Sequence, residues 1–233
     1  MPALSVVIPL YDEERRMAAG LAGLEALSGH LAEPPECILV DDGSRDGTLA
    51  LARRTAPRGT AVLAIPHGGK GAALAAGVAA AHGDRILLTD VDWSVPPDQI
   101  PRLVAEDADI VLATREGTGA HRIGEPAWRH LMGRVFNLVV RTVVLPGVQD
   151  SQCGCKLFRA DLARVLFAGL RVKGWAWDVE ILAAARARGA QIREVPVTWR
   201  YEADTRLRPL RDAPAMVRDV FEVRRVFGPH RRR

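Results

Sequence analysis

Residues 86–92, ILLTDVD, are the stretch from which the rest of this sequence is interpreted. The apolar run 86–88 is too short for a helix and is bounded by turn-forming residues on both sides, so it fits a buried parallel strand best. Asp90 and Asp92 then lie at the C-terminal end of that strand. Because residues i and i+2 of an extended chain point to the same face, we expect both carboxylates to converge on one Mg²⁺ or Mn²⁺ ion that also holds a diphosphate.

A plainer interpretation exists for any isolated pair of carboxylates. Asp90 and Asp92 could form turns, or cap a helix that follows Ser94, and for a lone D-x-D pattern this is the better interpretation. The patterns in the rest of the chain favour the metal site.

The composition indicates an ordinary folded domain. The 233 residues are 48% hydrophobic and 26% charged, and we expect a single domain over residues 1–233. Lysine and arginine exceed aspartate and glutamate by 32 − 28 = 4, which suits anionic ligands or an anionic membrane surface, with a basic solvated surface as the alternative. No stretch reaches the roughly 18 apolar residues that a membrane-spanning helix needs.

The cysteines and the N-terminus bear on location. Cys37, Cys153 and Cys155 are an odd number, and no histidine follows them at zinc-finger spacing. The N-terminus enters an apolar strand without the features of a signal peptide. We therefore expect a reduced, cytoplasmic protein.

Strands and helices alternate through residues 1–115. Such alternation predicts an α/β fold with a mostly parallel central sheet flanked by helices, whose ligands bind at the carboxyl ends of the strands. The predicted strands are residues 4–10, 37–40, 61–65, 86–88 and 108–114. The polar residues expected at the carboxyl ends are Asp41, Asp42, Asp90, Asp92 and Arg115.

Three local features carry their own predictions. Residues 11–14, with three acidic side chains, are expected to open a helix whose dipole they suit. Ser44 is expected to cap the following helix, and residues 94–105 to form one helix with two prolines in its first turn. The sequence around Lys70 is not a phosphate-binding P-loop, because no glycine stands five residues before Gly69.

The second half has a different pattern. Residues 116–124 read as a glycine-containing loop, 127–145 as an amphipathic helix, and 192–198 as a final strand. The amphipathic segment carries Trp128 and several arginines, so it is either a core helix or a helix that lies in a membrane interface. Residues 211–233 are expected to form a basic C-terminal helix and tail.

Taken in order, the motifs resemble those of inverting family 2 glycosyltransferases of GT-A fold, most closely the dolichyl-phosphate (polyprenyl-phosphate) β-glucosyltransferases. The resemblance covers nearly the whole chain. The motifs that carry it are VIP at 7–9 with Tyr11 and Glu13, VDDGS at 40–44, GKGAAL at 69–74, DVD at 90–92, Arg115, DSQCGCKLF at 150–158, WAWDVE at 175–180 and EVPVTW at 194–199.

The resemblance implies a role for each of these sites. Residues 1–115 would bind the nucleotide sugar, and residues 116–210 would face the acceptor and the membrane. It places the donor against Pro9, Tyr11, Glu13, Asp41 or Asp42, Lys70, Asp90 and Val91, the metal on Asp90 and Asp92, and basic groups near the phosphates at Arg115, Arg129 and Arg206.

The predicted reaction is transfer of a hexose, glucose from UDP-glucose, to a polyprenyl phosphate with inversion. Asp92, Arg115 and Asp178 are the predicted catalytic residues, with Asp178 assigned to positioning rather than to general base catalysis. We assign the lipid phosphate to Arg129 and Arg206, because one divalent ion cannot neutralise both the donor diphosphate and the acceptor phosphate.

Membrane contact is expected to rest on residues 128–145, because the hydrophobic anchor or membrane helices often present in the family are not seen in this sequence. The protein would then be peripheral on the inner face of the cell membrane. We expect no nucleic-acid partner, and the sequence does not define the oligomeric state. Three alternatives stay open: a mannosyltransferase that uses GDP-mannose, a nucleotidyltransferase, whose glycine-rich first loop is missing here, and a catalytically silent sugar-nucleotide-binding protein.

Overall fold

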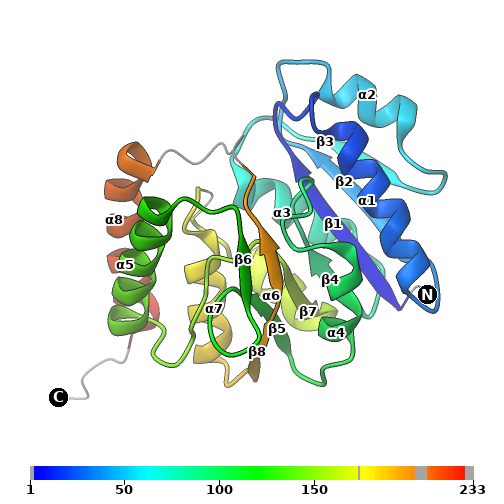
Figure 1. The fold of residues 1–233 in the computed structure, drawn as a ribbon. Coiled ribbons are helices and arrows are strands. Elements are labelled where there is room, and N and C mark those ends of the chain that lie inside the picture. Colours follow the sequence, from blue (N-terminus) through cyan, green and yellow to red (C-terminus); the bar gives the residue numbers. More distant parts are fainter. Residues whose placement is uncertain (1–2, 173, 203–208, 229–233) are drawn as a thin grey trace.

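The central sheet has the predicted, mostly parallel arrangement. A computed structural model of the chain describes residues 3–172, 174–202 and 209–228. In that part, seven strands form one sheet in the order β3-β2-β1-β4-β7-β5-β8 (Figure 1). Neighbouring strands are parallel except where β7 runs antiparallel to β4 and β5. The strands of this sheet are β1 (Leu4–Leu10), β2 (Glu36–Asp41), β3 (Ala61–Ala64), β4 (Arg85–Leu88), β5 (Ile110–Thr114), β7 (Lys156–Arg159) and β8 (Ile192–Pro196).

Helices cover both faces of the sheet because the strands are apolar on both sides. Along β1, Val7 belongs to one hydrophobic core, whereas Val6 and Ile8 belong to the other. One core is closed by α3 (Lys70–Ala80), α6 (Ala160–Ala168) and α7 (Trp177–Ala187). The other is closed by α1 (Met17–His30), α2 (Thr48–Thr55) and α4 (Ile100–Val104), and the 3₁₀ turn η1 (Pro97–Gln99), which buries no residue, leads into α4.

Two helix starts differ from the prediction. The acidic residues 12–14 do not open a helix, since α1 begins at Met17, and Asp12 adopts a φ of 52° that turns the chain instead. Residues 94–105 form η1 and then α4 rather than one helix. Pro101 lacks an N–H and is tolerated only in a first turn, so a new helix begins beside it at Ile100.

A second, small sheet joins two segments of the second half of the chain. The predicted loop 116–124 contains β6 (His121–Ile123), and the predicted strand 192–198 divides at Val197 into β8 and β9 (Thr198–Arg200). β6 and β9 pair in parallel. Val197 donates its N–H to Thr114 of the main sheet and accepts from His121, so it connects the two sheets.

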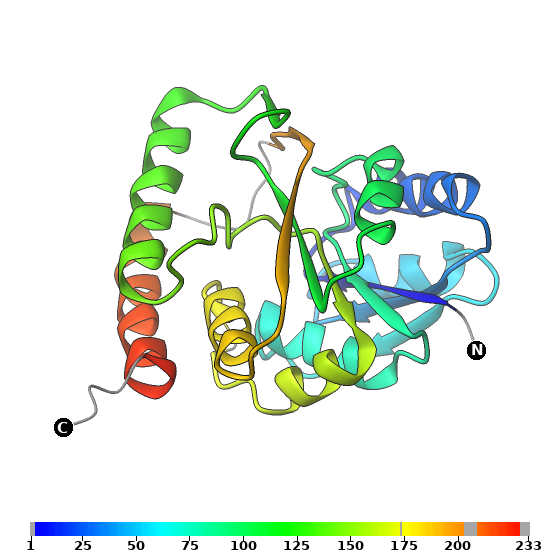
Figure 2. The same ribbon diagram turned by 90° about the horizontal axis from the view of Figure 1, so that it is seen from below.

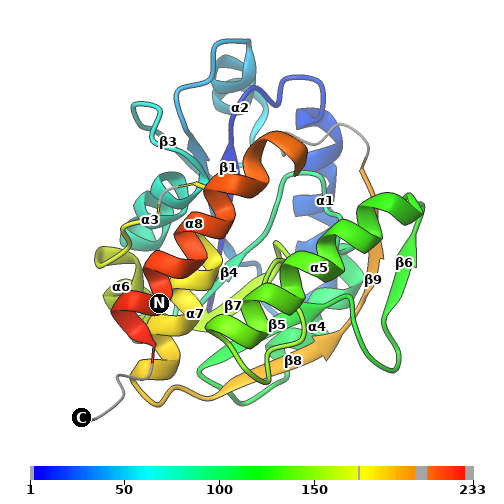
Figure 3. The same ribbon diagram turned by 90° about the vertical axis from the view of Figure 1, so that its left-hand side faces the viewer.

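Two long helices stand next to each other at one end of the molecule, beyond α7 (Figures 2 and 3). They are α5 (Ala127–Val143) and α8 (Pro209–Phe227). α5 buries Asn137 and Val140 but leaves a row of apolar side chains exposed, so it is not simply a core helix. The exposed side chains of this row are Trp128, Leu131, Val135 and Leu138. Among the described residues, no helix combines the length and apolar character needed to cross a bilayer.

Candidate active site

Most residues predicted to bind the nucleotide sugar lie around one pocket at the carboxyl edge of the sheet. β1, β2, β3 and β4 are parallel, so all four strands end at this edge and the loops that follow them begin there. The lining residues predicted from the sequence are Pro9, Tyr11, Glu13, Asp42, Lys70, Asp90, Val91 and Asp92. Asp41, also predicted, does not line this pocket: it is 1% exposed, and its carboxylate accepts the N–H of Ser44.

The carboxylates of Asp90 and Asp92 are brought to this pocket by a turn, not by strand alternation as predicted. β4 ends at Leu88, and the N–H of Trp93 donates to the carbonyl of Asp90 at 3.2 Å. Trp93 has a φ of 48°, a left-handed conformation that is unusual for a bulky residue. The prediction that strand alternation aligns the two carboxylates was wrong, because side chains alternate only while the chain remains extended, and β4 ends at Leu88.

Each carboxylate already has a cationic neighbour. Lys70 Nζ lies 2.6 Å from Asp90 Oδ1, and Arg16 Nη1 lies 3.4 Å from Asp92 Oδ2. Ser94 donates both its N–H and its hydroxyl to Asp92 Oδ1 at 3.0 Å. Burial opposes ionisation of Asp90, but the nearby cations, Lys70 foremost, together lower its pKa. Burial and the charge of Asp90 raise the pKa of Asp92.

These two carboxylates fit a divalent metal that is shared with a substrate. Mg²⁺ and its analogues are commonly held by one or two carboxylates together with substrate phosphates. Within residues 3–172, 174–202 and 209–228, no group of three or more histidine, cysteine or acidic side chains is placed to hold a metal alone. Gly154 keeps the position beside Asp90 open, since a Cβ there would lie 2.2 Å from Asp90 Oδ2.

The loop after β3 is fixed by Asp42. Its two carboxylate oxygens accept the N–H groups of Gly68 and Gly69 at 2.7 and 2.9 Å. His67 lies 2.9 Å from the same carboxylate and stacks on Tyr11 with ring centroids 4.4 Å apart. Ser44 accepts the N–H of Asp12 rather than capping α2, which begins after Gly47, because its hydroxyl is used to join the loops after β1 and β2.

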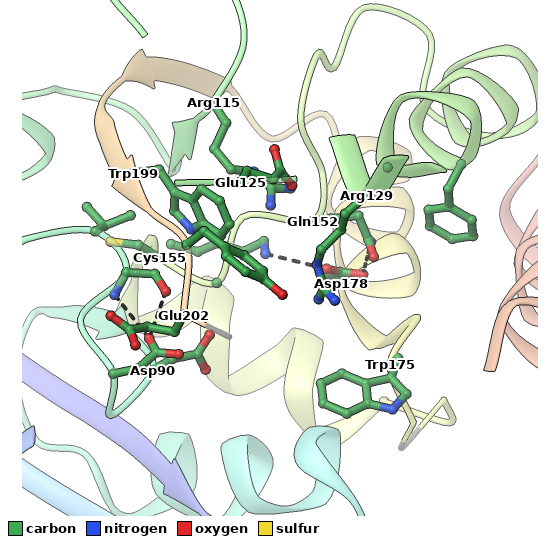
Figure 4. A pocket seen from close by; sticks show the side chains of 18 of the residues that line it. Asp90, Arg115, Glu125, Arg129, Gln152, Cys155, Trp175, Asp178, Trp199 and Glu202 are labelled. Carbon is green, nitrogen blue, oxygen red and sulfur yellow. Dashed lines mark hydrogen bonds and ion pairs between the residues drawn. The ribbon is translucent and has the colours of Figure 1, made fainter. Parts of the chain in front are cut away.

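A second pocket continues from the two carboxylates towards α5 (Figure 4). Lys70, Asp90, Asp92 and Trp175 line both pockets, so the two cavities meet at the predicted metal site. Beyond this junction, the lining combines cationic, aromatic and apolar side chains. The residues of this outer part include Arg115, Arg129, Trp199, Tyr201, Met132, Phe136 and Met216.

Arg115 lies in the second pocket and is held by a buried ion pair. Its Nε and Nη2 donate to the two oxygens of Asp150 at 2.7 and 2.8 Å, and its backbone N–H donates to the same carboxylate. Asp150 is 0% exposed, and Arg115 overcomes the effect of burial to hold the pKa of this carboxyl well below its usual range. Glu194 on β8 fixes the loop by accepting the N–H groups of Gln149 and Asp150 at 2.8 Å.

Asp178 also faces this pocket, and its Oδ1 accepts the N–H of Val179 at 2.9 Å. Gln152 donates its side-chain N–H to Asp178 Oδ1 at 2.7 Å, and Lys156 Nζ lies 3.5 Å from Asp178 Oδ2. Lys156 is 0% exposed and also donates to the carbonyl of Cys153. Burial raises the pKa of Asp178, and the ammonium of Lys156 acts against that rise.

Arg129 reaches the same pocket from the first turn of α5. Its guanidinium lies 5.2 Å from the ring centre of Tyr201. The start of α5 is fixed by Glu125, which accepts from Arg122 of β6 at 2.7 Å and lies 3.2 Å from His130. Arg206, the other predicted acceptor residue, lies outside the described residues.

Sequence reasoning did not find the roles of Arg16 and Lys156 in this site. Arg16 carries no local signal of its role, because its link to Asp92 spans 76 positions. Lys156 stands in the DSQCGCKLF motif, where a lysine within an apolar strand is a signal of a buried pairing partner. A search for charged residues inside predicted strands would have identified it.

The chain is similar to known proteins over most of its length. The chain is 30% identical to human dolichyl-phosphate β-glucosyltransferase over 241 residues, covering 95% of this chain and 74% of the human protein. It is 33% identical over 215 residues to undecaprenyl-phosphate 4-deoxy-4-formamido-L-arabinose transferase of Pseudomonas savastanoi, covering 89% and 61%. A dolichyl-phosphate β-glucosyltransferase of Trichomonas vaginalis is 30% identical over 219 residues, and the chain spans 65% of its length.

Solved structures show the same fold. Glucosyl-3-phosphoglycerate synthase from Mycobacterium tuberculosis, in complex with Mn²⁺, UDP and glucosyl-3-phosphoglycerate, superposes with a TM-score of 0.71 at 24% identity, over 99% of this chain and 82% of that chain. This likeness confirms the GT-A fold. Residues 5–167 match the description Glycosyl transferase family 2, and the chain therefore belongs to glycosyltransferase family 2.

Proposed function

We propose that this chain transfers glucose from UDP-glucose to a polyprenyl phosphate, with inversion at the anomeric carbon. The observation that carries the proposal is the meeting of two chemically different pockets at Asp90 and Asp92. The names of the family relatives support a polyprenyl-phosphate acceptor, and solved neighbours that contain UDP and Mn²⁺ support a uridine nucleotide donor and a divalent metal. Residues 1–115 would bind the donor, and residues 116–210 would bind the acceptor.

On the donor side, Tyr11 and Asp42 would bind the nucleoside, and Lys70 would contact the diphosphate. Asp90 and Asp92 would hold Mg²⁺ or Mn²⁺. When bound, the metal supplies electrostatic stabilisation of the charge that develops on the departing nucleoside diphosphate. Lys70, 2.6 Å from Asp90 and on the wall of both pockets, is placed to add positive charge at the same point.

On the acceptor side, a phosphate oxygen of the lipid would attack the anomeric carbon. A phosphomonoester has a second pKa of about 6, so the nucleophile is already ionised at neutral pH and needs no general base. Arg129 would bind the lipid phosphate, and Arg115 would contribute to the positive potential there. Asp178, held by Gln152 and Lys156, would orient the reacting groups rather than remove a proton.

The apolar part of the acceptor would leave between α5 and α8. Met132 and Phe136 of α5 and Met216 of α8 line the outer pocket, and an apolar row continues on the exposed face of α5. A helix that carries exposed apolar and cationic side chains suits an anionic membrane surface. We propose that α5 holds the protein peripherally on the membrane that contains its substrate. The arginines at 231–233 of the predicted basic tail lie outside the described residues.

Incubation with labelled UDP-glucose, Mn²⁺ and a short-chain polyprenyl phosphate tests this function directly. We expect the label to move into the lipid fraction. GDP-mannose as donor and 3-phosphoglycerate as acceptor are the matched alternatives, and preferential use of either would replace the proposed donor or acceptor. Donor binding measured by calorimetry without transfer to any acceptor would indicate a silent sugar-nucleotide-binding protein.

A further inference from the structure

The turn that carries Asp90 and Asp92 packs against one face of α1. Arg16 at the start of this helix approaches Asp92, Gly20 one turn later contacts Val91, and Gly23 contacts Trp93. Val91 is 4% exposed and Trp93 is 7% exposed, although both lie in the turn that forms the wall of the active site. The turn is therefore supported from behind by a helix that is remote in sequence.

The fit between the two glycines and the turn leaves no room for a side chain. A Cβ at Gly20 would lie 2.3 Å from Val91 Cγ2 and 2.8 Å from the Val91 carbonyl oxygen. A Cβ at Gly23 would lie 2.2 Å from both Cδ1 and Nε1 of Trp93. Rotation of the Val91 side chain could relieve the contact between a Cβ at Gly20 and Val91 Cγ2. It could not relieve the contact with the Val91 carbonyl oxygen, because that oxygen belongs to the backbone of the turn.

A hydrogen bond fixes the indole in this position. Trp93 Nε1 donates to the carbonyl oxygen of Gly20 at 2.8 Å. Trp93 also has a φ of 48°, which is costly for a bulky residue and persists only where surrounding contacts impose it. The packing against Gly23 and the bond to Gly20 are contacts of this kind.

We propose that Gly20, Gly23 and Trp93 form a latch that sets the conformation of the 90–93 turn and thereby the relative placement of the Asp90 and Asp92 carboxylates. Trp93 is then a positioning residue for the metal and the diphosphate, although it contacts neither. This inference rests on the proposed metal-dependent function. Partners behind metal ligands typically change metal affinity about 10–100-fold when they are altered, so the effect is measurable.

Glycine-to-alanine substitutions at three positions of α1 separate the latch from general effects on the helix. Gly20→Ala and Gly23→Ala push into the turn, whereas Gly29→Ala meets no atom within 4 Å. All three replace a glycine of α1 by alanine, which has the higher helix propensity. Binding of Mn²⁺ in the presence of UDP, measured from the electron paramagnetic resonance signal of free Mn²⁺, reports on the carboxylate pair without relying on transfer activity.

We expect Gly20→Ala and Gly23→Ala to weaken Mn²⁺ binding by about tenfold or more. UDP binding in excess chelator should stay close to that of the wild-type protein in both, and Gly29→Ala should match the wild type in both assays. Trp93→Phe, which keeps an aromatic ring but loses the bond to Gly20, should weaken Mn²⁺ binding to a smaller extent.

Wild-type affinity for Mn²⁺ in folded Gly20→Ala and Gly23→Ala would overturn the latch and leave the proposed function standing. Should both variants fail to fold, Trp93→Phe provides the test. Full Mn²⁺ affinity in this variant would overturn the latch, and weakened Mn²⁺ affinity would support it. A wild-type protein that binds no Mn²⁺ with UDP would refute the metal-dependent function itself, and the latch with it.

Discussion

The two pockets are assembled in different ways: the one at the carboxyl edge of the sheet, proposed to bind the donor (the donor pocket), and the one that continues towards α5, proposed to bind the acceptor (the acceptor pocket). The donor pocket is lined mainly by consecutive loops that leave β1 to β4 at the same edge of the sheet. The acceptor pocket draws on segments far apart in the sequence, from Lys70 to Met216, and includes two helices that pack beyond the sheet. The donor pocket is thus a consequence of sheet topology, whereas the acceptor pocket depends on how distant segments dock.

The charged side chains of the two pockets also have different surroundings. The donor pocket has carboxylates with cationic neighbours, Lys70 beside Asp90 and Arg16 beside Asp92. In the acceptor pocket the best-defined charge is Arg115, whose Nε and Nη2 both donate to the fully buried Asp150. Damage to the first pocket should therefore affect chemistry most, and damage to the second should also affect stability.

The largest effect is expected from Asp92→Ala. This change removes one of the two predicted metal ligands and should abolish transfer, a loss of more than about a hundredfold in kcat/KM, because charge on the leaving diphosphate is no longer offset. The protein should remain folded in thermal unfolding, and wild-type enzyme in excess chelator should be equally inactive.

Asp98→Ala is the matched control, since Asp98 is exposed and six residues further along the chain. It should retain activity. Full wild-type activity in excess chelator would contradict the metal assignment, whatever the behaviour of the variants.

The next effect concerns the ion pair behind the acceptor pocket. Asp150→Ala leaves the Arg115 guanidinium without its carboxylate and should lower the free energy of unfolding by about 3–5 kcal/mol. Denaturant unfolding measures this loss. The exposed pair of Arg193 and Glu106 provides the comparison, and Glu106→Ala should cost at most about 1 kcal/mol. Equal losses for the two variants would contradict the special role of the buried pair.

The same ion pair predicts a dependence of stability on pH. The pKa of Asp150 in the folded protein is held below its usual value because Arg115 outweighs the effect of burial. The stabilisation that ionised Asp150 contributes is therefore complete above about pH 4, the ordinary value for aspartate, and is lost as the pH falls below it. Asp150→Asn should show a shallower loss of stability between about pH 5 and pH 2 than the wild type.

A smaller and more selective effect is expected from Arg129→Ala. Loss of this cation should lower kcat/KM for the polyprenyl phosphate, because the lipid phosphate loses a charged partner. The loss of transition-state stabilisation calculated from the kcat/KM ratio should be on the order of 2–4 kcal/mol. UDP-glucose binding in the presence of metal, measured by calorimetry, should barely change. We expect the same from Arg206→Ala.

Arg134→Ala controls for removal of positive charge from α5, since Arg134 is exposed on the same helix. With a water-soluble short-chain acceptor it should resemble the wild type. Equal losses in donor binding and in acceptor kcat/KM would indicate that Arg129 binds the donor diphosphate. Unchanged values in both assays would indicate that Arg129 binds neither substrate.

The smallest effect per residue is expected on the exposed face of α5. Leu131 is 63% exposed, so Leu131→Gln should change stability by less than about 0.5 kcal/mol while reducing co-sedimentation with anionic liposomes roughly threefold to tenfold. Val165→Gln, 55% exposed on α6, is the matched control and should sediment like the wild type. Wild-type protein that does not sediment with anionic liposomes at low salt would remove the membrane proposal.

The sequence by itself determined the class of fold and which side chains gather at the carboxyl edge of the sheet. Apolar runs of strand length, alternating with helices, predict a mostly parallel sheet, and the carboxyl ends of parallel strands must meet at one edge. The sequence could therefore bring Tyr11, Asp42 and Asp90 together without any knowledge of packing. These predictions succeeded because they depend on local pattern and on a general property of parallel sheets.

Only the tertiary structure decided how the carboxylates and the acceptor pocket are arranged. Asp90 and Asp92 meet at the pockets because a turn, supported by α1, replaces the extended strand that the spacing implied. Arg115 finds Asp150 across 35 positions, and Arg16 reaches Asp92 across 76. No local pattern encodes such pairings, since they arise when helices and loops dock on the finished sheet and close contacts then select the conformation of each turn.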